Sequence, residues 1–117
     1  MVTILNGSGS LSISAEVFTS LAGDAATRCF GVKGMVGKAK ESGIYQLLRR
    51  ESMSKGVSVT FLDEGAVSIA LHLAVDSGVN LPVLAQNIIR EVGYKVSEAT
   101  GICVEQVDVY IDSMVVE

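Results

Sequence analysis

The side chains of this chain that could do chemistry are few and scattered. His72 is the sole histidine, and Cys29 and Cys103 are the two cysteines. A histidine acts as a general base when a nucleophile and an orienting group accompany it, and the sequence shows neither beside His72. A zinc site needs more Cys or His ligands at suitable spacing than these three residues provide. We therefore predict no metal and no cofactor, and we interpret His72 as a polar residue on an exposed or interface face.

The acidic side chains give no clearer catalytic signal. Asp24 could serve as an acid in a cleft, but its spacing from Arg28 favours an ion pair along one face of a helix. Asp108 and Asp112 are four residues apart on an expected strand, which separates them by about 13 Å. We predict that both are solvated, that the chain has no catalytic residues, and that the protein is not an enzyme.

Two overlapping GxxG patterns occur, at 31–34 and 34–37. KH domains clamp a nucleic-acid backbone with such a loop, which requires a helix on each side. Here the pattern leads into glycine-punctuated chain, and no aromatic residues interleave with the neighbouring bases to stack on nucleobases. We therefore interpret the pattern as a tight backbone turn.

Charge is unevenly distributed along the chain. The formal net charge is −4, yet the segment 28–55 holds seven bases and two acids, which gives +5 there and −9 elsewhere. Such a two-signed surface favours steering an acidic protein, or another copy of the chain, over stable capture of nucleic acid. The residues that we expect to bind a partner are Lys33, Lys38, Lys40, Arg49, Arg50 and Lys55. The alternative is a nucleic-acid or anionic-ligand binder that uses the same basic segment 28–55.

Length and composition indicate one packed domain. The 117 residues are 49% hydrophobic and 19% charged, so we predict a single domain over 1–117 with a mainly aliphatic core. The first residues lack the regions of a signal peptide, and no stretch approaches the roughly 18 apolar residues of a membrane span. Cys29 and Cys103 share no CxxC context, and we expect free, buried thiols in a reducing cytoplasm.

Hydrophobic periodicity and turn residues predict the elements that hold these side chains. Asn6-Gly7-Ser8-Gly9 suits a hairpin turn, Ser14 is a good helix N-cap, and Asn80 and Gly101 bracket a long amphipathic helix. The expected elements are strands at 2–5 and 10–13, a helix from Ser14 to about Gly31, a strand within 31–37, a short helix over 42–50, strands at 57–61 and 67–75, a helix over 81–100 and a strand at 107–112.

These elements predict an α+β fold with the order β-β-α-β-α-β-β-α-β. Clean alternation of apolar and polar residues indicates strands that are covered on one face only. We therefore expect a mainly antiparallel sheet with helices packed on one face.

The outer face of the second predicted hairpin carries small side chains without Lys, Arg, Asp or Glu. Its members are Ser58, Thr60, Ala66, Ser68, Ala70, His72 and Ala74. An ordinary solvated strand face carries more charge. We expect this face to pack against a second copy of the chain, giving a homo-oligomer, or to lie under the chain's own loops.

Six blocks of sequence occur together in a characteristic order. They are Ser12-Ile13-Ser14-Ala15-Glu16-Val17, Leu21-Ala22-Gly23-Asp24-Ala25-Ala26-Thr27, Gly31-Val32-Lys33-Gly34-Met35, Ser54-Lys55-Gly56-Val57, Gly78-Val79-Asn80-Leu81-Pro82, and Thr100-Gly101 before Val107-Asp108-Val109-Tyr110-Ile111. With these blocks, nearly the whole chain resembles the bacterial alkaline-shock-protein (envelope stress response) family, and its length is similar to that of the short, housekeeping-type members.

The resemblance implies a binding or scaffold protein that acts through protein–protein contacts. Members are cytoplasmic, some are tethered near the membrane by a partner, and some self-associate. No catalytic residues are established for the family, so none is carried over to this chain. From the charge distribution we expect no specific nucleic-acid binding. Because the basic segment is short and poor in bulky apolar residues, we expect no direct membrane insertion. The chain departs from the family's pattern at Arg28-Cys29-Phe30, where an acidic stretch is typical.

Overall fold

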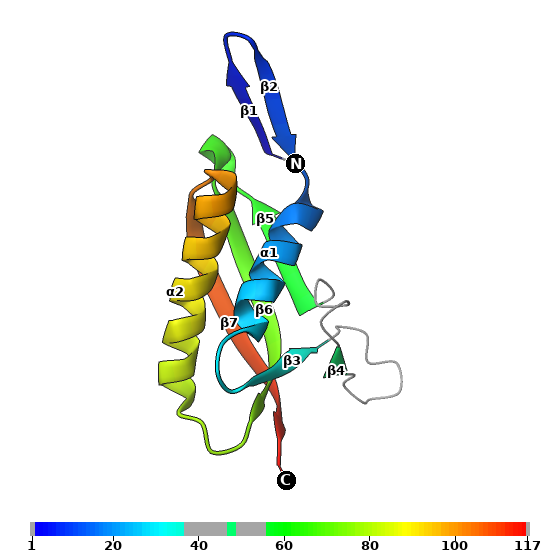
Figure 1. The fold of residues 1–117 in the computed structure, drawn as a ribbon, viewed down its shortest axis with the longest axis vertical. Helices are drawn as coiled ribbons and strands as arrows, with labels where there is room; N and C mark the ends of the chain where they lie inside the picture. Colours follow the sequence, from blue (N-terminus) through cyan, green and yellow to red (C-terminus); the bar gives the residue numbers. More distant parts are fainter. Residues whose placement is uncertain (1, 37–46, 49–55, 117) are drawn as a thin grey trace.

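The computed structural model describes residues 2–36, 47–48 and 56–116 of the chain (Figure 1). Its elements are β1 (Val2–Asn6), β2 (Gly9–Ile13), α1 (Ala15–Thr27), β3 (Val32–Val36), β4 (Leu47–Leu48), β5 (Val57–Phe61), a 3₁₀ turn η2 (Asp63–Gly65), β6 (Val67–Asp76), α2 (Leu81–Thr100) and β7 (Val104–Val115). The α+β fold class is confirmed.

The local signals at the helix ends explain where both helices begin and end. Ser14 precedes α1 in an extended conformation but makes no side-chain capping bond. At α2, the Asn80 Oδ1 accepts a hydrogen bond from the Val83 N–H at 3.1 Å, as an N-cap should. Gly101 ends α2 in the left-handed region at φ 73°, where glycine has no Cβ to clash.

β6 is the central strand of a five-stranded sheet. β5 pairs antiparallel with its first half, and β3 pairs antiparallel with its last residues. β7 pairs parallel with β6 along the other edge, so that Leu71 lies between Val57 and Val109. A parallel pairing needs a crossover, and α2 provides it. β1 and β2 form a separate two-stranded sheet.

Both helices lie on one face of the sheet, and the core fills the space between them and the strands (Figure 1). Alternate residues of β6 are buried there, as the period-two pattern predicts. Phe18 of α1 meets Phe61 of β5 edge to face, with ring centroids 5.8 Å apart. The helical side chains of this core are Phe18, Ala22, Ala25 and Ala26 from α1, and Leu84, Ile88, Val92 and Val96 from α2.

The predicted helix over 42–50 is wrong at the two positions that the structure describes. Leu47 and Leu48 form β4, which pairs antiparallel with Val36 and Met35 of β3. The backbone groups at the edge of β3 stabilise an extended partner there, and such tertiary pairing overrides a weak local helical preference. The other residues of that predicted helix lie outside the described part of the chain.

Candidate functional site

The turn that follows α1 exposes an aromatic side chain. The Cys29 N–H donates to the Ala26 carbonyl at 3.1 Å, and the Val32 N–H donates to the Cys29 carbonyl at 3.3 Å. Gly31 completes this turn at φ +97°, a conformation that glycine adopts without strain. Cys29 is buried at the core, whereas Phe30 is 91% exposed. The turn therefore presents the large apolar surface of the Phe30 ring to solvent, where a partner could cover it.

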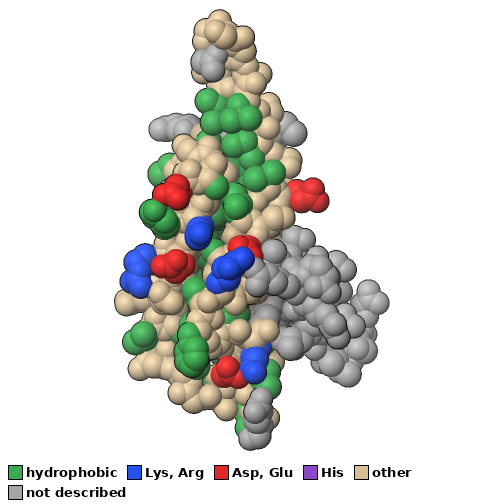
Figure 2. Space-filling view, viewed as in Figure 1, with side chains coloured by type: hydrophobic (Ala, Val, Ile, Leu, Met, Phe, Trp, Pro, Cys, Tyr) green, Lys and Arg blue, Asp and Glu red, His purple; other side chains and the backbone are tan. Residues whose placement is uncertain are grey.

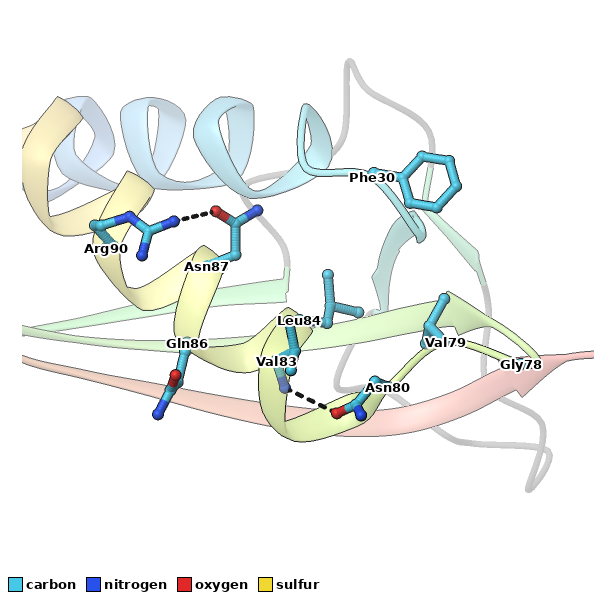
Figure 3. Close-up of a pocket in the computed structure, with 9 residues that line it drawn as sticks. All are labelled: Phe30, Gly78, Val79, Asn80, Val83, Leu84, Gln86, Asn87 and Arg90. Atoms are coloured by element: carbon cyan, nitrogen blue, oxygen red, sulfur yellow. Dashed lines mark hydrogen bonds between the residues drawn. The ribbon is translucent and has the colours of Figure 1, made fainter.

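Phe30 borders a pocket of about 420 Å³ between the turn after α1 and the first turns of α2 (Figure 3). The described residues that line it are Phe30, Gly78, Val79, Asn80, Val83, Leu84, Gln86, Asn87 and Arg90. Two further hollows also have Phe30 in their walls: one extends toward Asp76 and Val115, and the other toward Arg28 and Glu91. We call these three hollows the Phe30 groove.

Both apolar and polar groups face the pocket. Val83 is 63% exposed, so Phe30 and Val83 together present apolar surface to solvent. The Arg90 Nη2 donates to the Asn87 Oδ1 at 2.9 Å, which fixes the guanidinium on the α2 side (Figure 3). Among the described residues that line this pocket, Arg90 alone carries a charge. The pocket therefore combines an apolar surface with a cationic edge.

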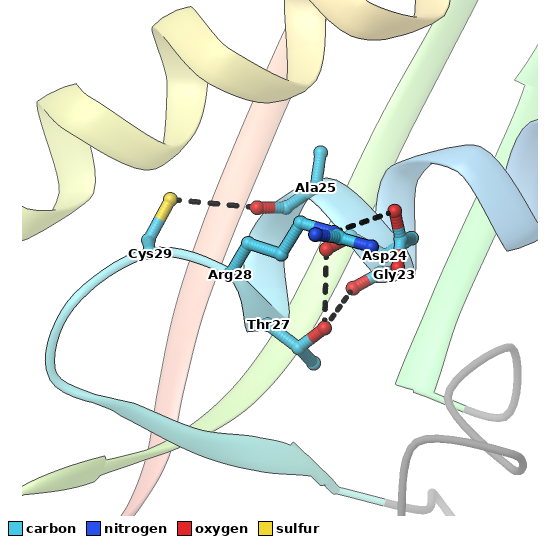
Figure 4. Close-up of polar contacts among 6 residues, drawn as sticks. All are labelled: Gly23, Asp24, Ala25, Thr27, Arg28 and Cys29. Atoms are coloured by element: carbon cyan, nitrogen blue, oxygen red, sulfur yellow. Dashed lines mark hydrogen bonds and ion pairs between the residues drawn. The ribbon is translucent and has the colours of Figure 1, made fainter.

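Asp24 is part of the structure of α1 and does not line the pocket. Its Oδ2 accepts from the Arg28 Nε at 3.0 Å (Figure 4), which confirms the predicted pair across one helical turn. The Thr27 hydroxyl caps the same turn by donating to the carbonyls of Gly23 and Asp24. Exposed pairs of this kind contribute about 0–1 kcal/mol.

The prediction that both thiols are buried is right for Cys29 and wrong for Cys103. The Cys29 Sγ lies 3.5 Å from the Ala25 carbonyl (Figure 4). Burial, followed by the nearby Glu91 carboxylate, raises the pKa of the Cys29 thiol, and Arg90 partly opposes them. Cys103 is exposed. Its neighbour Ile102 is buried, so the chain that leads into β7 turns the next side chain outward.

Iodoacetamide should therefore modify one thiol quickly in the folded protein. We expect Cys103 to react fast, because it is accessible, and Cys29 to react only on unfolding, because burial lowers both access and thiolate population. Mass spectrometry should show one adduct in buffer and two in urea. The matched control is Cys103→Ser, which should show none in buffer. Fast modification of Cys29 in that variant would contradict the described burial.

The predictions that His72 lacks an orienting partner and that Asp112 is solvated are wrong. The His72 Nδ1 lies 2.8 Å from the Asp112 Oδ2, and the imidazole stacks on Tyr110 with ring centroids 4.8 Å apart. Leu73 pairs with Ile111 but Ala74 pairs with Ser113, so Asp112 is an extra, bulged residue. Tyr110 pairs with His72, and Asp112 lies two residues further along β7, where its carboxylate reaches the imidazole across the strand pair. Spacing within a single strand does not predict such a contact. This cluster ties β6 to β7.

The basic segment is described only in part. Arg28 pairs with Asp24, and the Lys33 Nζ lies 3.2 Å from the Asp76 Oδ1. The other expected partner-binding residues lie outside the described residues: Lys38, Lys40, Arg49, Arg50 and Lys55. The first GxxG pattern follows helix α1 and enters strand β3, so it is the expected turn and not a loop between two helices.

The outer face of the β5–β6 hairpin offers less free surface than its composition suggests. Ala66 and Ala74 are buried, and Thr60 is exposed. The remaining members are half-buried, including His72. Self-association through this face stays a prediction.

Sequence reasoning missed the residues that make the Phe30 groove. The available signal was the position of Phe30 between the last turn of α1 and the turn glycine Gly31. A residue at this position lies beyond the apolar face of the helix, so its side chain does not pack in the core with that face. Val83 and Arg90 gave no signal of their own, since they occupy ordinary exposed positions of an amphipathic helix.

Across the described residues, no cluster of three or more His, Cys, Asp or Glu side chains is arranged to hold a metal ion, and neither described helix has the length and apolar character to cross a membrane.

The sequence matches one family model and several known proteins. The model of the alkaline shock protein 23 family, whose description is "cell envelope-related function", matches residues 3–116. The uncharacterised protein YloU of Bacillus subtilis (strain 168) is 34% identical over 108 residues, which cover 91% of this chain and 88% of YloU. The uncharacterised protein Spy1614 of Streptococcus pyogenes serotype M6 is 31% identical over 114 residues, which cover 97% and 93% of the two chains. No solved structure matches the chain.

Proposed function

This chain belongs to the alkaline shock protein 23 family, which has a cell-envelope-related function, and this match confirms the resemblance found in the sequence. On that premise we propose that the chain is a non-enzymatic binding protein. It acts through protein–protein contacts made by the Phe30 groove, in the cytoplasm beside the envelope. The observation that carries the proposal is the exposed Phe30 ring at the edge of a pocket with apolar walls.

Phe30 has the properties of an interface anchor. Aromatic side chains that fill a pocket on a partner, or that help to form one, supply most of the binding energy of many interfaces. The turn that carries Phe30 is fixed by backbone hydrogen bonds and by the buried Cys29. A ring on such a rigid support loses little conformational entropy on binding.

The charge in the pocket favours an acidic partner segment. Arg90 is held by Asn87 on the α2 side, within reach of a ligand that contacts Val83. A partner that inserts an aliphatic side chain beside Phe30 and places an Asp or Glu near Arg90 would satisfy both features. The described bases of segment 28–55 lie beside carboxylates, which gives nucleic acid no comparable support.

A binding role also agrees with the positions of the residues that catalysis would need. Cys29 is buried at the end of α1, whereas His72 lies with Asp112 on β6 and β7. Asp24 is paired with Arg28 on the surface of α1. Each of these side chains has a structural partner of its own, and together they form no described active-site arrangement.

Selection of displayed random peptides on the immobilised protein tests the proposal. We expect the enriched peptides to carry an aliphatic residue near Asp or Glu. Phe30→Ala should weaken binding of a synthetic enriched peptide by about 2 kcal/mol or more, roughly 30-fold, because the anchor is lost. Arg90→Glu should weaken it and remove the acidic preference. The affinities are measured by fluorescence anisotropy.

Tyr94→Ala is the matched control, since Tyr94 is an exposed aromatic residue of α2 that does not line the pocket. It should leave the affinity within about threefold. The proposal fails if no peptide is enriched or if Phe30→Ala binds the enriched peptide as well as the wild type does. Filter binding that shows RNA or DNA affinity tighter than about 1 μM at physiological salt would favour the basic-segment alternative instead.

A further inference from the structure

The strand β7 has one edge that pairs with no described strand. β7 is 12 residues long and pairs with β6 along its other edge. Within the described residues, the main sheet ends at β7 (Figure 1). A strand at the edge of a sheet presents a row of unpaired N–H and C=O groups, which is a template for pairing with another chain. The backbone of this edge therefore suits an extended peptide segment.

The charged side chains of β7 are all acidic. The strand contains Glu105, Asp108 and Asp112 and no Lys or Arg. On the helical face of the molecule, by contrast, acidic and basic side chains lie interspersed over α1 and α2 (Figure 2). The Gln106 amide donates to the Asp108 carboxylate at 2.9 Å, and Asp112 lies beside His72. Among the described residues, no Lys or Arg pairs with these three carboxylates.

Two of the carboxylates share the outer face of β7, away from the helices. Val107 and Val109 pack on the core, so Asp108 between them points to the outer face. Asp112, whose carboxylate reaches His72, lies on that face too. A strand added along β7 places its own outward side chains beside these two residues. Opposite charges on neighbouring strands stabilise their pairing, so Lys or Arg is favoured at both positions.

The same charges disfavour a second copy of the chain at this edge. Two β7 strands related by a twofold axis run antiparallel. When such a pair is centred on Tyr110, near the middle of the strand, Asp108 of each copy lies opposite Asp112 of the other. Like charges directly opposite each other destabilise strand pairing. The phosphates of nucleic acid and of anionic lipid are repelled for the same reason.

We propose that the free edge of β7 binds an extended segment of a partner protein by strand addition, and that this segment carries Lys or Arg at two positions four residues apart. The two bases lie beside Asp108 and Asp112. The neighbouring residues of the segment lie on the opposite face, where aliphatic side chains cover the exposed parts of Val109 and Ile111. Neither carboxylate lines the Phe30 groove, so the two surfaces are separate.

A short synthetic peptide with the central sequence Lys-Val-Thr-Val-Lys and uncharged flanks tests this proposal. We expect it to bind, measured by fluorescence anisotropy, and to slow hydrogen exchange in β7. A peptide with Glu in place of both Lys residues should bind about tenfold more weakly or less, because two attractions become two repulsions. Asp108→Lys should reverse this preference. Methylation of the peptide's backbone nitrogens along one edge should abolish binding and along the other edge should not, because only one edge pairs with β7.

Glu16→Lys is the matched control, since Glu16 is an exposed acid at the start of α1 and its replacement changes the net charge equally. It should bind the Lys peptide as the wild type does. Phe30→Ala should also bind it normally, which separates this test from that of the Phe30 groove. The proposal is overturned if no peptide binds at about 1 mM, if the Lys and Glu peptides bind equally, or if both methylated peptides still bind. A wild-type dimer that protects the β7 edge from exchange without any peptide would assign the edge to a second copy and also overturn it.

Discussion

Replacing Phe18 by alanine is expected to lower the free energy of unfolding by about 3–5 kcal/mol. Phe18 is fully buried on α1, and its ring packs edge to face on Phe61 of β5. Its loss removes apolar burial and also leaves a cavity between a helix and the sheet, where the surrounding backbone cannot collapse freely. Because domains of this size are stable by about 5–15 kcal/mol, the variant should approach the limit of folding. Urea unfolding followed by circular dichroism measures the change.

Val17→Ala provides the control for this loss. Val17 precedes Phe18 on the same helix but is exposed, so its truncation should change stability by about 0.5 kcal/mol or less. Equal destabilisation by the two substitutions would mean that α1 does not present Phe18 to the core as described.

The second large loss of folding stability is expected when Gly31 is replaced by alanine. Alanine there must adopt φ near +97°, and its Cβ would lie 3.0 Å from the Val79 Cγ1. The left-handed backbone costs about 1–2 kcal/mol and the overpacking about 1–3 kcal/mol more, which gives a loss of about 2–5 kcal/mol. Val79 also lines the Phe30 pocket. Gly31→Ala should therefore weaken peptide binding as well as thermal stability.

The control variant Gly101→Ala separates the backbone cost from the overpacking cost. Gly101 also has a positive φ, 73°, but a Cβ there would meet no atom within 4 Å. It should cost only the backbone term of about 1–2 kcal/mol and leave the affinity for the peptide unchanged. A melting temperature of Gly31→Ala at or above that of Gly101→Ala would show that Val79 moves aside without cost.

The elements predicted correctly from sequence are those that local residues determine. Asn80 and Gly101 bracket α2 at its observed ends, Leu81 and Thr100, because a capping side chain and a left-handed glycine act within one turn of the helix. The β5–β6 hairpin is equally predictable from sequence. Period-two alternation on both sides of a short turn determines which residues form the strands, which face of each strand is buried and how the strands pair.

The failures came where distant parts of the chain decide the outcome. The local pattern at Leu47 and Leu48 favours a helix, but the edge of β3 supplies a partner for an extended backbone. Spacing within one strand leaves Asp112 solvated, whereas the parallel pairing of β6 with β7, which local sequence does not specify, sets its carboxylate beside His72. The Phe30 groove forms where the turn after α1 meets the start of α2. These two segments are far apart in the sequence, so the spacing of residues along the chain does not predict that they lie together.

The parallel pairing of β6 with β7 also bears on how the chain reaches its fold. β5 and β6 are joined by a short turn and can pair as soon as both exist, whereas His72 and Asp112 are 40 residues apart in the sequence. Contacts between distant residues form slowly, because a long loop must close before they can form. During synthesis, β6 therefore leaves the ribosome well before β7, and the whole of α2 must follow before the last strand can dock. Until then β6, most of whose side chains are buried in the folded protein, has one unpaired edge, and we expect chaperones to bind the nascent chain within this interval.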